Sequence, residues 1–135
     1  MARPPVDTRE IDAFAARLGR MGPAVRRAVG DTNHRIATAM AKRGKIITPR
    51  SDDGTHIADS ITVETGDARL MEYTVAVGSA ALIYAVPLEF GHVARDGSHV
   101  PANPFWVPLT RIFRKRHRSG LRTALRKALR QELGL

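Results

Sequence analysis

The C-terminal part of the chain constrains the fold most, because its pattern predicts one long, cationic helix. From about Val107 to Leu133, apolar residues recur at helical spacing, interrupted at Ser119-Gly120. A helix of about 27 residues is about 40 Å long, whereas a globule of this chain length is only about 35–40 Å across. The helix must therefore cross the whole body, kink, or project from it. We expect a kink or a projection, because five consecutive polar residues, Arg114 to Arg118, cannot all face a core.

The positive charge is concentrated in the same segment. The 135 residues include 22 Lys and Arg against 13 Asp and Glu, a net charge of +9. Nine of these bases lie between Arg111 and Arg130, with Glu132 the only acid after residue 110, so residues 1–110 are close to neutral. A cationic segment on a neutral body indicates an anionic partner, either nucleic acid or an acidic protein surface. A solvated helix face is the alternative. The residues expected to meet the partner are Arg114, Lys115, Arg116, Arg118 and Arg122.

The same helix carries an apolar stripe that favours docking against protein. Leu121 and Leu125 continue it beyond Gly120. No aromatic residue follows Phe113, which disfavours a platform for stacking single-stranded bases.

Composition excludes several classes of protein. Hydrophobic residues make up 43% and charged residues 26%, as in an ordinary globular domain. No apolar run approaches the ~18 residues of a membrane span, so we expect no membrane contact. The first residues lack the apolar centre of a secretion signal, so we expect no export by that route and synthesis in the cytoplasm. The absence of cysteine excludes disulfides and thiolate metal sites.

The first half of the chain predicts two helices and a hairpin. Residues 7–20 show the amphipathic spacing of a short helix, and residues 23–47 predict a longer one that ends at Thr48-Pro49. Residues 60–66 and 71–79 alternate apolar and polar side chains, which is typical of an antiparallel hairpin with one buried face.

The next apolar segment is ambiguous. Residues 82–91 contain Pro87, which indicates an edge strand, a bulge or a strand-to-helix corner. Residues 92–105 are expected to be loop.

These elements predict a single α+β domain. Two N-terminal helices pack on a small, mostly antiparallel sheet, and the long basic helix closes the structure. The expected divisions are a helical part (1–48), a β-rich part (58–91), a loop (92–105) and the basic C-terminal helix (106–134).

No residues form a recognisable catalytic, cofactor or metal motif. The five histidines include no pair at the helical metal-site spacing. His92, Asp96 and His99 share a segment, but we interpret them as a solvated polar loop. Neither a nucleophile elbow nor a phosphate-binding glycine loop is found. We therefore predict no catalysis, no cofactor and no bound metal.

An ordered set of short motifs runs from the second helix to the last. Ile-Ile-Thr-Pro is followed by Ala-Asp-Ser-Ile-Thr-Val, by Tyr-Ala-Val-Pro-Leu-Glu-Phe-Gly-His at residues 84–92, and by Val-Pro-Ala-Asn-Pro-Phe-Trp-Val-Pro-Leu at residues 100–109. This order resembles the tail-component family of long-tailed bacteriophages, the small head–tail joining or tail-completion proteins, over residues 35–115. The matching positions are Tyr84, Glu89, Phe90, Gly91, Pro101, Ala102, Pro104, Phe105 and Pro108. The chain departs from the family pattern at Pro87, at His92, at Trp106-Val107 and in a longer turn after Pro49.

The resemblance implies a non-enzymatic structural subunit. Such a subunit forms a ring, expected to be a hexamer, that joins or terminates the tail at the head around the DNA channel. Its partners would be other neck and tail-tube proteins and genomic DNA in the lumen. It would be assembled in the host bacterial cytoplasm and reside in the virion. The expected subunit interface comprises Tyr84, Glu89, Phe90, Gly91, Pro104, Phe105, Trp106, Leu121 and Leu125.

Two of these positions leave alternatives open. Glu89 lies in an apolar run and, if buried, needs a cationic or N–H partner, from a neighbouring subunit or from its own chain. Phe105 and Trp106 either fill the domain's own core, which we favour, or anchor a neighbour.

Two other functions compete with the ring. A small basic DNA-binding protein would use the same cations but would need a helix-turn-helix, which cannot be placed in this sequence. A nuclease-type toxin would need a site centred on His92 and His99.

Overall fold

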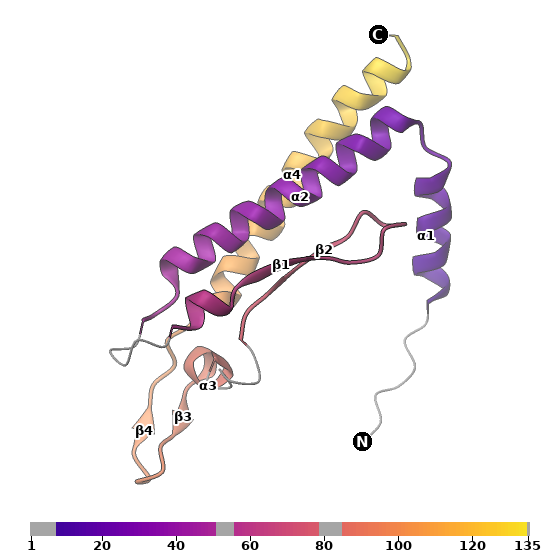
Figure 1. Cartoon of the computed structure of the whole chain (residues 1–135). Coiled ribbons are helices and arrows are strands. Elements are labelled where there is room, and N and C mark those ends of the chain that lie inside the picture. The colour runs from indigo at the N-terminus through magenta and orange to yellow at the C-terminus, as the bar shows by residue number, and fades with distance from the viewer. Residues whose placement is uncertain (1–7, 51–55, 79–84, 135) are drawn as a thin grey trace.

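The computed structural model describes residues 8–50, 56–78 and 85–134, and the centre of the structure has two layers (Figure 1). Two long helices lie side by side, and a β-hairpin runs along one side of the pair. The elements in chain order are α1 (Arg9–Gly19), α2 (Pro23–Ile47), the 3₁₀ helix η1 (Ile57–Ser60), β1 (Thr62–Thr65), β2 (Tyr73–Ala76), α3 (Ala85–Phe90), β3 (His92–Val93), β4 (His99–Val100) and α4 (Trp106–Glu132). The predicted α+β class with a long C-terminal helix is confirmed.

The two long helices, α2 and α4, are antiparallel along their whole length. At one end, a Cβ added at Gly44 would lie 3.3 Å from the Leu109 side chain, so α2 approaches the start of α4 closely there. At the other end, the backbone N–H of Ala24 donates to Glu132 Oε1 at 3.0 Å. The expected helix break or free projection is therefore wrong, because α4 continues through Gly120 and its last turn is bonded to α2.

The polar run in α4 is accommodated by the helical period. Phe113 and half-buried His117 lie four residues apart and face inward, while Arg114, Lys115 and Arg116 between them are exposed. The His117 ring lies 2.7 Å from Asn33 Oδ1 of α2. A run of cations therefore fits a helix packed along one face only.

The predicted hairpin is confirmed. β1 and β2 are antiparallel with Val63 opposite Val75. The hairpin lies against α2, where the Asn33 side-chain amide donates to the Met71 carbonyl at 2.9 Å and the His34 and Tyr73 rings lie 5.0 Å apart. α2 is thus the helix that supports the sheet.

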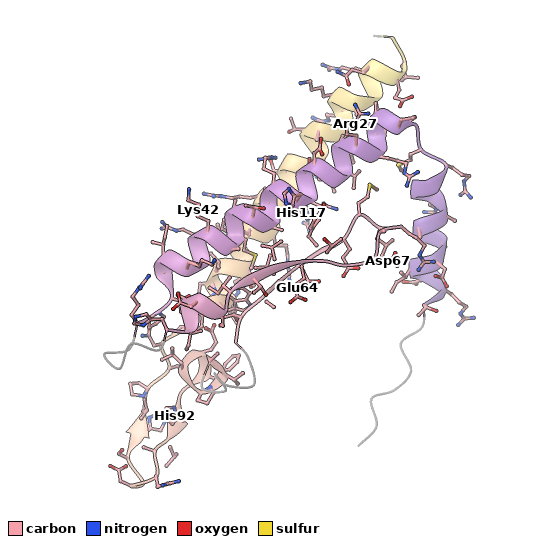
Figure 2. All side chains as sticks on the ribbon, in the orientation of Figure 1. Arg27, Lys42, Glu64, Asp67, His92 and His117 are labelled. Carbon is pink, nitrogen blue, oxygen red and sulfur yellow. The ribbon has the colours of Figure 1, made fainter. Side chains whose placement is uncertain are left out.

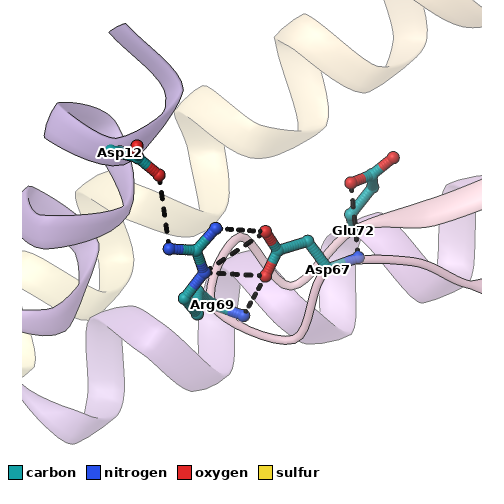
Figure 3. Close-up of polar contacts among 4 residues, drawn as sticks. All are labelled: Asp12, Asp67, Arg69 and Glu72. Atoms are coloured by element: carbon teal, nitrogen blue, oxygen red, sulfur yellow. Dashed lines mark hydrogen bonds and ion pairs between the residues drawn. The ribbon is translucent and has the colours of Figure 1, made fainter. Parts of the chain in front are cut away.

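The first helix, α1, meets the turn of this hairpin through an exposed ion pair (Figure 3). Arg69 Nη1 lies 3.3 Å from Asp12, and Arg69 Nη2 lies 2.9 Å from Asp67. The hydrogen bonds from Arg69 hold the pKa of Asp67 below its ordinary value. Both N-terminal helices were predicted to pack on the sheet. In the structure, α2 contacts the hairpin broadly, whereas α1 makes a polar contact with its turn only.

A hydrophobic cluster lies where η1, α3 and the start of α4 meet. It contains Ile57, Ala85 and Phe105, all buried. The Ser60 hydroxyl next to it donates to the Ile57 carbonyl at 2.6 Å and accepts the N–H of Gly78 at 2.8 Å. This cluster fixes α3 against the first turn of α4.

Residues 85–90 are a helix, with Pro87 in its first turn, where a missing N–H breaks no hydrogen bond. Of the three expectations for this segment, an edge strand and a bulge are wrong for these residues, and the helix fits the strand-to-helix corner. Residues 82–84 lie outside the described residues. Residues 92–105 are not entirely loop, because β3 and β4 form a second short hairpin with His92 opposite Val100. Both short hairpins are two-stranded sheets of their own.

Candidate functional site

Glu89 of α3 accepts three hydrogen bonds in the signature region. Its Oε2 accepts the backbone N–H groups of Phe105 and Trp106 at 2.8 and 2.9 Å, and its Oε1 accepts that of Val107 at 2.8 Å. The N–H groups of Trp106 and Val107 are the first of α4, and Phe105 is the residue before it, so none of the three has a partner within the helix. The residue at the helix start, Phe105, has no side chain that can cap it. Glu89 therefore serves as the N-terminal cap of α4 from 16 to 18 residues away.

The charge on Glu89 is stabilised by this arrangement. Burial of the carboxyl opposes ionisation, but the three N–H bonds together outweigh it, so the pKa of Glu89 lies below its ordinary value of 4.5. The positive end of the α4 dipole acts in the same direction. Of the two partners expected for Glu89, the structure supplies N–H groups of its own chain, and a neighbour's Arg is not required.

Other signature residues also have internal roles. Phe105 is buried in the hydrophobic cluster, and half-buried Trp106 packs against it, as the core interpretation predicted. Gly91 has a φ of +79°, and a Cβ there would lie 2.9 Å from the backbone N of Ala102. Glu89, Gly91 and Phe105 therefore have roles inside the fold, and their expected place at a subunit interface stays a prediction. Pro104 is exposed, and Tyr84 lies outside the described residues.

Phe90 differs from its neighbour Glu89, because it points to solvent. Its exposed fraction is 69%, and that of Val86, four residues earlier on the same face of α3, is 65%. Val93, at the start of the second hairpin, is exposed to a similar extent. We call Val86 and Phe90 the apolar knob. Figure 1 shows α3 and the second hairpin at one end of the α2–α4 pair.

The predicted leucine contacts on α4 are partly satisfied within the chain. Leu121 and Leu125 are half-buried, whereas Leu129 is exposed. The apolar stripe of α4 therefore mainly packs against α2.

The predicted cations fall on two faces of α4. Arg114, Lys115, Arg118 and Arg122 line a depression of about 430 Å³ together with Arg111 and Ser119. We call the five bases of this depression the cationic stripe. It has no acidic lining residue and spans about 16 Å along the helix. Arg116 lies on a different face, with its guanidinium 5.1 Å from the centre of the Phe113 ring.

A second source of positive charge lies on α2 and was missed from sequence. α2 and α4 together contain 15 of the 22 Lys and Arg but only two of the 13 acids, Asp31 and Glu132. Residues 56–78 contain four acids, Asp59, Glu64, Asp67 and Glu72, against Arg69 alone. Arg27 and Lys42 on α2, and Glu64 and Asp67 on the hairpin, mark the two layers in Figure 2. The net charge of residues 1–110 is therefore close to zero because the positive charge of α2 is offset by the negative charge of the hairpin.

Several hollows border the helix pair, among them two that include large apolar side chains of both helices. One, of about 450 Å³, lies between the hairpin and the two helices and is lined by Met40, Tyr73, Trp106 and His117 among others. The other, of about 580 Å³, lies between α2 and α4 and includes Ile46, Ile112 and three bases, Lys42, Arg43 and Arg116. We call the second hollow the basic-rimmed groove. It contains no acid among its lining residues.

The histidine segment shows no metal-binding geometry. His92 and His99 lie on β3 and β4, and Asp96 in the turn accepts the N–H and hydroxyl of Ser98 at 2.9 and 2.6 Å. These bonds hold the pKa of Asp96 below its ordinary value. Within residues 8–50, 56–78 and 85–134, no three His, Asp or Glu side chains gather at a metal-binding distance. Across the same ranges, every helix is too short or too polar to cross a membrane.

Comparison of the chain with protein-family models, with curated proteins and with solved structures finds no match.

Proposed function

We propose that the chain is a structural subunit of the neck of a long-tailed phage or of a phage-derived particle. Copies of it form a ring, expected to be a hexamer, that joins or terminates the tail at the head around the DNA channel. Support comes from the ordered motifs of residues 35–115, which resemble the tail-component family. On this proposal, the protein assembles in the host bacterial cytoplasm, becomes part of the virion, and has no enzymatic activity.

The observation that carries the proposal is the contrast between Glu89 and Phe90. Glu89 is locked inside the chain by three N–H groups, whereas Phe90 and Val86 of the same helix are exposed. Exposed clusters of large apolar side chains mark contact sites with other proteins. The signature helix thus has an internal side that builds the fold and an external side that remains available to a neighbour.

The cationic stripe gives the subunit a surface for an anionic partner. In a ring it would face genomic DNA in the lumen or an acidic face of an adjoining neck or tail-tube ring. Contact with DNA would be independent of sequence, because the stripe consists of Arg and Lys, which bind phosphates.

The mass of the purified protein in solution tests the ring. We expect one closed oligomer by light scattering and native mass spectrometry, and density for the same ring in the neck of intact particles. A chain that is monomeric at all concentrations and absent from particles would overturn the proposal.

A small basic DNA-binding protein is the second candidate, favoured by the concentration of bases on α2 and α4. Salt-dependent retention of duplex DNA by a chain that never forms a ring would support it over the neck subunit.

A further inference from the structure

The groove between α2 and α4 has the chemistry of a contact with protein. Ile46 and Ile112 are 63% and 53% exposed at this groove. A phosphate backbone has no apolar surface to match these side chains, whereas the cationic stripe presents bases on the other side of α4. Nucleic acid therefore fits the stripe, and an apolar side chain fits the groove.

One base on the rim of the groove already lies over an aromatic side chain of its own helix. The Arg116 guanidinium lies over the Phe113 ring at 5.1 Å, a favourable cation–π arrangement. Lys42 and Arg43 flank the same groove from α2. A second aromatic ring that enters the groove would contact apolar side chains inside it and the bases at the rim of the groove.

The same chain carries a side chain suited to this groove. Phe90 is 69% exposed, so the groove of its own chain does not receive it. The knob adds no positive charge, because α3 contains no base and its one acid, Glu89, is bonded inside the chain. Phe90 is also the last residue of α3, where helix carbonyls carry partial negative charge, which complements Lys42, Arg43 and Arg116.

We propose that the apolar knob of one copy, Val86 and Phe90, docks into the basic-rimmed groove of the next copy. The contact joins two different surfaces, so it is head-to-tail, which is the arrangement that closes a ring. The inference rests on the proposed ring and names the surfaces that form it.

Two complementary variants of the full chain test the contact. Phe90→Asp disables the knob and keeps the groove, whereas Ile112→Asp disables the groove and keeps the knob. Each variant alone is expected to be monomeric by light scattering. An equimolar mixture is expected to form a 1:1 heterodimer and nothing larger, because a single intact knob and a single intact groove remain. Leu133→Asp, at an equally exposed apolar position, is the matched control and is expected to keep the wild-type mass.

A cross-link provides a second test that does not depend on disrupting the interface. Because the chain has no cysteine, Phe90→Cys and Ile112→Cys introduce the only thiols. Oxidation is expected to join the mixed single variants as covalent dimers and to give a ladder from the double variant. Covalent dimers from Phe90→Cys alone would mean a symmetric contact and would overturn the inference.

The outcomes separate the inference from the ring itself. If both Asp variants form a ring of the wild-type mass, the knob-and-groove contact is overturned, but the proposed ring is not. Two monomeric variants that do not pair on mixing would also overturn it. Loss of duplex DNA retention in Ile112→Asp with an unchanged mass would assign the groove to nucleic acid. A monomeric wild-type chain would instead remove the ring.

Discussion

Glu132, the last residue of α4, accepts the backbone N–H of Ala24 at the start of α2 through Oε1 at 3.0 Å. The residue before α2 is Gly22, which has no side chain for capping, and a Cβ there would collide with the Glu132 carboxylate. At the opposite end, Glu89 caps the start of α4. The N-terminus of each long helix is therefore capped by a carboxylate from a distant part of the chain.

Glu89→Gln tests the importance of the buried cap. The amide keeps one acceptor but replaces the other oxygen with a donor, so at least one buried N–H of α4 loses its partner. We expect the free energy of unfolding to fall by about 2 kcal/mol. Urea unfolding measures it. Glu64→Gln on the exposed hairpin is the control and should change stability little. An equal loss in both variants would mean that Glu89 has no special role.

The same cap predicts an acid-sensitive fold. Because the pKa of Glu89 is lowered in the folded state, its stabilisation is present above the unfolded value near 4.5 and is lost as pH falls through the folded pKa. The difference in unfolding free energy between wild type and Glu89→Gln should therefore be constant from pH 7 to about 5 and shrink at lower pH. Denaturant titrations at each pH measure this difference. A difference that grows in acid would contradict the assignment.

Gly91, directly before the second hairpin, and Gly97, between its two strands, form a matched pair. Both have a positive φ, but a Cβ at Gly91 would lie 2.9 Å from a backbone atom, whereas the space around Gly97 is open. Gly97→Ala should cost about 1 kcal/mol from the strained backbone alone. Gly91→Ala should cost about 3 kcal/mol, because steric crowding is added. Similar midpoints of thermal unfolding for the two variants would show that the joint after α3 is not tightly packed.

The ion pair between α1 and the hairpin turn should matter little for stability. The Arg69 and Asp12 side chains are 61% and 56% exposed, so solvent screens their attraction. We expect Asp12→Asn to leave the midpoint of thermal unfolding almost unchanged. Thermal unfolding at low and at high salt checks this. A larger loss that persists at high salt would require a contact beyond the ion pair.

Regular patterns in the sequence were sufficient for the long elements. The helix predicted over residues 23–47 and the hairpin around Val63 and Val75 are found in the structure, because their periods extend over several residues. α3 has six residues, too few to show a helical period, so Pro87 left an edge strand, a bulge and a strand-to-helix corner as alternatives. The second hairpin has two residues in each strand, so alternation could not reveal it.

The candidate site was less predictable, because it depends on contacts between distant residues. The apolar residues on either side of Glu89 indicated that it needs a partner if buried. The identity of that partner could not be predicted, because the N–H groups that bind it lie 16 to 18 residues away in the sequence. Phe90 and Glu89 are adjacent in the signature, and only the helix of α3 turns one outward and the other inward. The charge of α2 was hidden because the acids of residues 56–78 cancelled it in the sum over residues 1–110.

The salt dependence of DNA binding tests the cationic stripe. If its five bases each neutralise one phosphate, log K should fall against log salt concentration with a slope of about −4.5 for duplex DNA. Replacing Arg118 and Arg122 by Gln should make this slope shallower by about 1.8, since two counterions fewer are released. Removing the same charge near α1 with Arg17→Gln and Arg20→Gln should leave the slope unchanged. Equal effects of the two double variants would mean that DNA responds to net charge rather than to the stripe.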